Sequence, residues 1–381
     1  MTGSLRVTGR LAWRNLWRNH RRTLIMLAAV IVGAWAMIFM TALMRGMVDD
    51  MVRDGIKTLP GHVQVHHPEV RDDPSVENSI AEPSGPLLEA LSRPEVVAWA
   101  SRIKVPAVVS SERNTRGVVL VGIDPERERD LSFVAGDMAD GRFLESPEDQ
   151  GLIVGRKLLE RLETDLGKRV VVMSQDRENE IADRGFRVVG VYDSRLQAQE
   201  EGFVFAGRAT VQRLLHMDDQ VSEIAVLGTD YRNVDGLRDR VAAAAGPDMA
   251  VEAWPVLEPY LGSMLPMMDG FVFVWIVVVF LALAFGLVNT LVMAVFERVR
   301  EIGLMLALGM TPGSIRAQII TESTILLALG LFIGDLLAWL TVKPLEKGID
   351  LSIVGEGMEY FGAAAVLYPC LLYTSDAADE V

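Results

Sequence analysis

The sequence predicts an integral membrane protein with three membrane-spanning helices and a large α+β domain on the extracytoplasmic side. Residues 23–44 and 270–296 carry no charge, and each run is longer than the roughly 20 helical residues that cross a bilayer. The chain is 50% hydrophobic and 23% charged, with a mean hydropathy of +0.26. This composition is too apolar for an ordinary soluble domain and too charged for a bare helix bundle, so the charges must be concentrated in separate segments.

Basic residues precede the first span, which is predicted over residues 23–44. Residues 1–22 carry arginines at every fourth position and then a closing pair: Arg6, Arg10, Arg14, Arg18, Arg21 and Arg22. The spacing predicts an amphipathic basic helix lying on an anionic membrane surface, and the positive-inside rule places the N-terminus in the cytoplasm. A cleaved signal peptide is the alternative, but its apolar region is expected to be shorter, about 7 to 15 residues.

Residues 45–269 are long enough for a folded domain with its own core. The residue pattern predicts strands over residues 61–68, 107–110, 117–123, 151–154, 169–173, 186–192 and 222–227, and helices over residues 156–162, 209–216 and 234–245. In residues 61–68, apolar and polar side chains alternate, which predicts a strand with one face exposed to water. The mixture of elements predicts an α+β domain, which follows the first span and is therefore exported.

The second span, residues 270–296, returns the chain to the cytoplasm, where charges arrive at once in residues 297–316. A third span follows over residues 317–342 and contains two carboxylates, Glu322 and Asp335. A carboxylate at the centre of a membrane helix costs about 3 kcal/mol on insertion scales and usually faces protein or water. Glu322 is close to the cytoplasmic end, so we interpret it as an interfacial acid with a partner. For Asp335, a proton path is the alternative to a protonated or paired carboxyl.

The end of the chain departs from this pattern. Residues 343–369 are predicted to form an external loop. The apolar residues 361–373 are interrupted by Pro369 and too short to cross, so a fourth helix is expected to be truncated. Residues 370–381 look like a translated sequencing adapter and are predicted to be non-native. Cys370 is the sole cysteine, which excludes an internal disulfide and a multi-cysteine zinc site.

The segment after the second span has the most specific pattern, Glu297-Arg298-x-Arg300-Glu301-Ile302-Gly303-x-x-x-Ala307-x-Gly309. It resembles the signature of the FtsX-like permeases, membrane subunits of ABC transporters that include the MacB exporters and the lipoprotein-releasing LolC/LolE proteins. The resemblance implies that these residues couple the chain to a partner ATPase. The charged residues would fix the orientation through ion pairs, and the glycines would allow close backbone approach. A simpler alternative is that the charges only set the membrane topology.

The resemblance extends to the predicted external domain, whose short blocks at residues 122–124, 141–144, 152–155 and 186–191 are similar to those of the MacB-like periplasmic core domain. The sequence WRNLWRNHRRT around the first span, followed by GHVQVHHPEV and DDP, looks most like the LolC/LolE type.

This resemblance implies a function and a set of partners. The chain would be a non-catalytic subunit of the cytoplasmic (inner) membrane, with ATP and Mg²⁺ bound by a separate ATPase. It would pair with a second copy or a related permease and pass lipoproteins to a periplasmic carrier. The alternatives are a MacB-like exporter of peptides or small molecules, and an FtsX-like scaffold that activates a cell-wall hydrolase.

Other kinds of site find little support. The net charge of −14 argues against nucleic-acid binding, which needs a basic face. The sequence GLIVGRK at residues 151–157 lacks the spacing of a phosphate-binding loop. His62 and His66 would share one face of a strand, but a polar strand face explains them as well as a metal site, which would need a further ligand.

Overall fold

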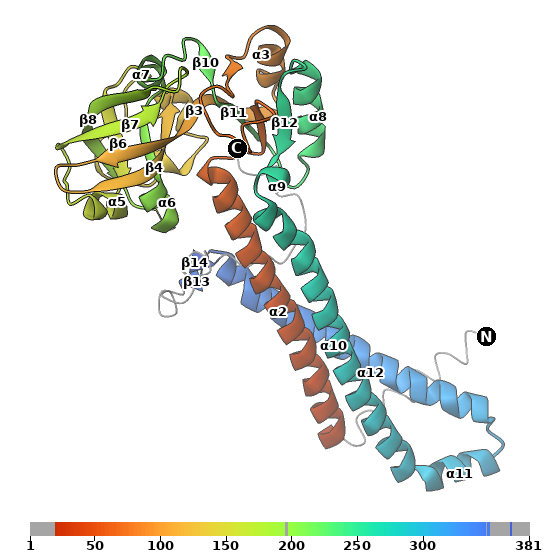
Figure 1. Ribbon diagram of the computed structural model, residues 1–381. Helices are drawn as coiled ribbons and strands as arrows, with labels where there is room; N and C mark the ends of the chain where they lie inside the picture. Colours follow the sequence, from red (N-terminus) through yellow and green to blue (C-terminus); the bar gives the residue numbers. More distant parts are fainter. Residues whose placement is uncertain (1–19, 195–196, 348, 351–365, 368–381) are drawn as a thin grey trace. The chain divides into compact units, whose positions relative to one another are not determined.

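The computed structural model describes residues 20–194, 197–347, 349–350 and 366–367, and it divides the chain into two compact units (Figure 1). The first, here called the membrane unit, includes the described residues up to Asp49 and those from Leu265 onward. The second, here called the α/β domain, is formed by Asp50–Met264. The predicted fold class is confirmed: among the described residues, three helices are long and apolar enough to cross a membrane, and they accompany a large domain of strands and helices.

The membrane unit is built from long helices with short connections. Its elements are α2 (His20–Thr58), α10 (Pro259–Glu297), α11 (Val299–Ala307), α12 (Pro312–Val342), the 3₁₀ helix η2 (Lys343–Lys347) and the short pair β13 (Ile349–Asp350) and β14 (Val366–Leu367). Helices α2 and α10 both continue beyond the membrane unit into the α/β domain.

Two glycines, Gly330 and Gly334, allow α12 to approach α2 closely. A Cβ atom added at Gly330 would lie 2.6 Å from Val30 Cγ1, and one at Gly334 would lie 2.8 Å from Ala34 Cβ. The indole of Trp35 donates a hydrogen bond to Thr341 Oγ1 at 3.0 Å. Small residues and an interhelical hydrogen bond are typical of helix packing in membranes.

The α/β domain contains a ten-stranded sheet in the order β12-β1-β11-β3-β4-β9-β6-β8-β5, with β7 paired to both β3 and β8. The strands are β1 (Val63–His66), β3 (Val96–Ser110), β4 (Thr115–Ile123), β5 (Met138–Gly141), β6 (Gly151–Gly155), β7 (Arg169–Gln175), β8 (Ile181–Tyr192), β9 (Phe203–Gly207), β11 (Glu223–Gly228) and β12 (Ala250–Ala253). Because β7 bridges β3 and β8, the strands β3, β4, β9, β6, β8 and β7 close into a ring.

Short helices surround these strands: α3 (Gly85–Leu91), α4 (Pro125–Glu128), η1 (Phe133–Ala135), α5 (Arg156–Arg161), α6 (Gln197–Gly202), α7 (Arg208–Leu214), α8 (Asp235–Ala244) and α9 (Trp254–Leu257). A small separate pair joins β2 (Ile80–Ala81) to β10 (Gln220–Val221). Every predicted strand and helix of the domain overlaps an observed one. Strands β2, β5, β9, β10 and β12 were not predicted.

The prediction of a wet face for residues 61–68 is wrong. Strand β1 is buried along its whole length, and His62, Gln64 and His66 are only 8%, 7% and 1% exposed. The reason is that β1 lies inside the sheet, paired with β11 on one side and β12 on the other. The polar side chains of this strand are therefore part of the interior.

Candidate functional site

The candidate site is the segment from Glu297 to Gly309, which connects two of the apolar helices. Helix α10 ends at Glu297, and Arg298 leaves the helical conformation with φ −104° and ψ 9°. The Arg298 N–H bonds the Val295 carbonyl at 3.1 Å, and the Arg298 carbonyl accepts from Ile302 at 2.9 Å. A single residue therefore separates α10 from α11 and sets the change of direction between them.

Gly309 ends helix α11. It has φ +92°, a left-handed conformation that glycine adopts without steric cost. Its N–H bonds the Leu306 carbonyl and the Met310 N–H bonds the Met305 carbonyl, both at 3.0 Å. This is the Schellman arrangement of a helix C-terminus. Gly309, predicted to allow close approach of an ATPase, thus has a structural role of its own.

Helix α12 begins directly afterwards, at a Thr-Pro pair. The Thr311 hydroxyl caps the helix by accepting from the Ser314 N–H at 3.4 Å, and Pro312 is the first helical residue. A proline at this position needs no hydrogen-bond acceptor, and its fixed φ suits a helix start. The two caps together make the connection between α11 and α12 short and defined.

The surface of α11 is open. None of its residues is buried. The apolar side chains of Val299, Leu304 and Leu306, and that of the capping residue Leu308, are 55%, 64%, 44% and 78% exposed. A Cβ atom at Gly303 would meet no atom of the described residues within 4 Å. Helix α11 therefore offers a mixed apolar and charged surface that the described part of the chain does not cover.

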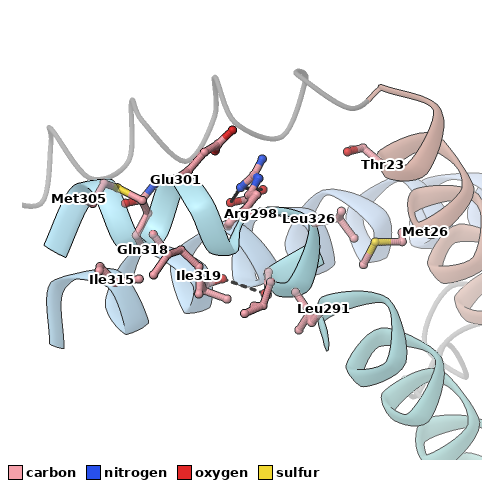
Figure 2. Close-up of a pocket in the computed structure, with 14 residues that line it drawn as sticks. Thr23, Met26, Leu291, Arg298, Glu301, Met305, Ile315, Gln318, Ile319 and Leu326 are labelled. Atoms are coloured by element: carbon pink, nitrogen blue, oxygen red, sulfur yellow. Dashed lines mark hydrogen bonds and ion pairs between the residues drawn. The ribbon is translucent and has the colours of Figure 1, made fainter. Parts of the chain in front are cut away.

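The inner side of α11 borders a pocket within the membrane unit (Figure 2). Its lining comes from α2, α10, α11 and α12: Thr23, Met26, Leu291, Val295, Arg298, Glu301, Ile302, Met305, Ile315, Gln318, Ile319, Glu322, Ser323 and Leu326. Most of these side chains are apolar.

An ion pair crosses this pocket. Arg298 Nη1 lies 3.1 Å from Glu322 Oε2, and the two side chains are 14% and 15% exposed. Charge-assisted contacts of this kind are the stronger hydrogen bonds in proteins. The pair joins the residue between α10 and α11 to the first third of α12, so it fixes α11 against the third apolar helix.

The structure brings some predicted site residues together and separates others. Arg298, Glu301, Ile302 and Glu322 meet around the pocket. Glu297, Arg300, Gly303 and Ala307 lie on the open side of the segment. Asp335 is exposed on α12, more than three helical turns beyond Glu322 in sequence.

The predicted membrane-surface arginines are mostly outside the described residues. Arg6, Arg10, Arg14 and Arg18 fall in residues 1–19, and the side chain of Arg22 also lies outside the described part of the chain. Arg21 is exposed at the start of α2. The predicted loop at 343–369 and tail at 370–381 lie largely or wholly outside the described residues as well.

Sequence reasoning did not single out the polar residues Thr23, Gln318 and Ser323 of the pocket. A signal was present for Gln318, since it lies four residues before Glu322 and shares a helix face with it. Nothing in the sequence connected Thr23 to this region.

The histidines considered as metal ligands are held by the protein itself. His62 Nδ1 accepts from the Gly228 N–H at 3.0 Å, and His66 Nδ1 lies 2.8 Å from the His67 carbonyl. Burial lowers the pKa of His62 to about 4, although Asp230 opposes the shift. Among the described residues, no group of three or more His, Cys, Asp or Glu side chains is arranged to hold a metal ion.

Comparison with known proteins gives two family matches. The profile of the MacB-like periplasmic core domain matches residues 23–244, and that of the FtsX-like permease C-terminal region matches residues 273–370. LolC of Neisseria meningitidis serogroup B, a lipoprotein-releasing system transmembrane protein, is 22% identical over 302 residues, which are 77% of this chain and 70% of that protein.

Two further relatives are more distant or cover less. An ABC transporter permease of Methanocaldococcus jannaschii is 24% identical over 232 residues, 58% of this chain and 56% of that protein. Among solved structures, the periplasmic region of MacB from Actinobacillus actinomycetemcomitans aligns with 55% of this chain and 97% of its own, with 13% identity and a TM-score of 0.38.

Proposed function

Because the chain belongs to the family of ABC transporter permeases that join a MacB-like periplasmic core domain to an FtsX-like C-terminal region, we propose that it couples a separate ATPase to the release of lipoproteins from the cytoplasmic membrane. In this proposal the N-terminus and α11 face the cytoplasm, and the α/β domain is in the periplasm. The ATPase binds ATP and Mg²⁺, and the permease itself catalyses no reaction.

The observation that carries the proposal is the open surface of α11. A helix with exposed leucines between two apolar spans is unfavourable in water unless a partner covers it. Gly303 supports the same view, because a glycine inside a helix costs about 1 kcal/mol relative to alanine and no atom of the residues that the structure describes occupies the space beside it. A tightly fitting partner surface would account for both features.

Coupling would use the continuity of the helices. ATP binding would move the ATPase against α11, and the Arg298–Glu322 pair would make α11 and α12 move together. Helix α10 is one helix from Pro259 to Glu297, so a displacement at its α11 end would pass along it to the α/β domain.

Lipoprotein release is the finer part of the proposal. It is supported by the similarity to LolC over most of the chain and by the resemblance around the first span. The working unit would contain two copies of the chain, or this chain and a related permease, with a periplasmic carrier as acceptor. Export of peptides or small molecules is the second candidate, favoured by the match to the MacB-like domain.

The test is purification of the protein from its native membranes, followed by mass spectrometry of its partners. We expect an ATPase together with lipoproteins. An ATPase with an outer-membrane channel would favour export of peptides or small molecules. An ATPase with a cell-wall hydrolase would favour an FtsX-like scaffold that activates this hydrolase. The absence of any ATPase would contradict the proposal.

A charge reversal tests the role of α11 directly. Glu301 borders the pocket, but it is also exposed on α11. Glu301→Lys should reduce recovery of the ATPase about tenfold or more, because like charges across an interface cost several kcal/mol. Glu258→Lys, which reverses an exposed charge in the α/β domain, is the matched control. Normal recovery with Glu301→Lys would mean that the charges of α11 only set the topology.

A further inference from the structure

The C-terminal end of helix α2 is held inside the α/β domain by an arginine. A helix leaves its last four carbonyls without intrahelical partners. Here Gly61, at φ +67°, turns the chain and donates its N–H to the Ile56 carbonyl at 3.1 Å. The Leu59 carbonyl, one residue beyond α2, accepts from the Arg102 guanidinium. A cation is a favourable donor at this position because a helix C-terminus carries partial negative charge.

Arg102 is itself fixed by two carboxylates. It lies in the middle of β3 and is 0% exposed. Its Nε and Nη2 atoms donate to Glu128, at the end of α4, at 3.0 and 2.7 Å. Its Nη1 lies 3.5 Å from Glu223, the first residue of β11. Burial by itself would lower the pKa of Arg102, but Glu128 and Glu223 raise it above its ordinary value, so the guanidinium stays charged.

Stability alone does not explain this buried triad of Arg102, Glu128 and Glu223. Apolar residues of similar volume often replace buried ion pairs with no loss of stability, or even with a gain. An apolar side chain could not, however, donate a hydrogen bond to the end of α2. The distinctive property of the triad is therefore the directional link from Leu59 to three elements of the domain.

The same end of α2 has two more contacts in the domain. Thr58 Oγ1 accepts from Gln199 Nε2 at 2.6 Å, which connects α2 to α6. The Leu59 side chain is 2% exposed and packs in an apolar cluster with Phe205 and Tyr192. The end of α2 is thus held on one side by the hydrogen bond from Arg102 to the Leu59 carbonyl. On the other side it packs against side chains from the strands of the ring.

We propose that Arg102 is the positioning residue through which movement of helix α2 reaches the strands of the periplasmic domain. The guanidinium carries a displacement of the Leu59 carbonyl into β3 directly, and into α4 and β11 through the two carboxylates. Without it, the displacement would be absorbed by the turn at Pro60 and Gly61. This inference depends on the proposed function, because an ATP-driven movement must first enter at α11.

The experiment measures hydrogen exchange in the full permease–ATPase complex, without nucleotide and with ATP trapped by a hydrolysis-deficient ATPase. A neutral variant, Arg102→Met/Glu128→Leu/Glu223→Gln, removes the link and keeps the interior packed. Arg102→Lys is the second variant, because an ammonium group cannot replace the fork of a guanidinium. The control is Arg208→Met/Glu82→Leu, which removes a half-buried ion pair elsewhere in the domain.

In the wild type, ATP should change exchange in α11 and also in β3 and β11. In the neutral variant the change in α11 should remain, and the change in β3 and β11 should fall by roughly tenfold, the effect expected from loss of a hydrogen bond to a charged group. The lysine variant should be intermediate, and the control should match the wild type.

Two results would overturn the inference in distinguishable ways. If α11 responds to ATP and the response in β3 and β11 survives in both Arg102 variants, movement enters the domain by another route and Arg102 is only structural. If α11 shows no response in the wild type, the proposed coupling itself fails, and the inference fails with it.

Discussion

At the scale of single residues, His62 connects the stability of the α/β domain to pH. Its ring is 8% exposed, and Nδ1 must be unprotonated to accept from the Gly228 N–H. Its pKa falls from 6.5 to about 4 in the folded chain, whereas the unfolded chain keeps the ordinary value. Between these values the unfolded state binds more protons, so stability is complete above pH 6.5 and is lost as the pH falls toward 4. The full effect is about 3 kcal/mol.

His62→Asn should remove most of this pH dependence, because the Asn amide oxygen can still accept from Gly228 but does not titrate. The measurement is thermal unfolding of the purified chain at pH 7 and pH 4.5. The wild type should lose more stability than the variant by roughly 2 to 3 kcal/mol. His216→Asn is the control, since the His216 side chain is 72% exposed. Equal losses in the wild type and His62→Asn would contradict the prediction.

Glu322 shows how far single residues could be understood from the sequence. A carboxylate in an apolar helix had to have a partner, and the sequence indicated that much. It could not identify Arg298, which lies 24 positions away and reaches Glu322 only after the chain has turned at Arg298 and Gly309. The residues of the coupling segment were predictable from their pattern, whereas the pocket that joins four helices was not.

At the scale of elements, helix α11 should remain stable with a larger side chain at Gly303, whereas the ATPase should no longer bind it tightly. Gly303→Gln places a strong helix former where no atom of the described part of the chain lies within 4 Å, so the variant chain should be as stable as the wild type or more stable, by about 0.5 to 1 kcal/mol. The ATPase should bind it at least about tenfold more weakly, because the new side chain fills the space that the partner surface needs.

The measurement is affinity between the purified permease and its ATPase, together with the unfolding temperature of the permease alone. Gly246→Gln is a suitable control, because Gly246 in the α/β domain also has open space beside it. Unchanged affinity of the Gly303 variant would show that the ATPase contacts another part of the chain.

The existence and the burial of the strands differ in how well the sequence predicts them. Strands such as β4 and β8 were predictable because their β-branched residues fit a pleated surface. The burial of β1 was not, because alternation of apolar and polar residues does not reveal that β11 and β12 flank the strand on both sides. Strand β9 is a short apolar run between glycines, and periodicity alone cannot separate such a run from a helix segment.

At the scale of the whole molecule, the order of the strands in the sheet could not be predicted from local residue patterns. The ring closes where Val108, Val109 and Ser110 of β3 pair with Met173, Val172 and Val171 of β7. More than sixty positions separate the partners along the chain, and the pairing is determined by packing of the core inside the ring. The division into apolar spans and an α/β domain was predictable, because it depends on the composition of continuous segments and not on which distant strands pair.

The proposed pairing of two permeases makes a prediction for helix α10. Of the three candidate spans found among the described residues, α10 is the least covered by the rest of the chain. In its most apolar stretch 6% of the residues are buried, against 22% in α2 and 28% in α12. Asn289 lies within that apolar run, and its side chain is exposed. A carboxamide in hydrocarbon gains from a polar partner. Two copies related by a two-fold axis along the membrane normal place identical residues at the same depth, and Asn is complementary to itself because its amide both donates and accepts.

Cysteine cross-linking in native membranes tests this pairing. With Cys370→Ser removing the only other thiol, Asn289→Cys should form a disulfide between two copies under mild oxidation. Leu283→Cys should not, because Leu283 packs against Gly33 of the same chain. Cross-linking of Asn289→Cys only to a cysteine introduced in a different permease would show that the partner is a related subunit. If Asn289→Cys cross-links neither to a second copy of the chain nor to a different permease, lipid or cargo covers this face of α10.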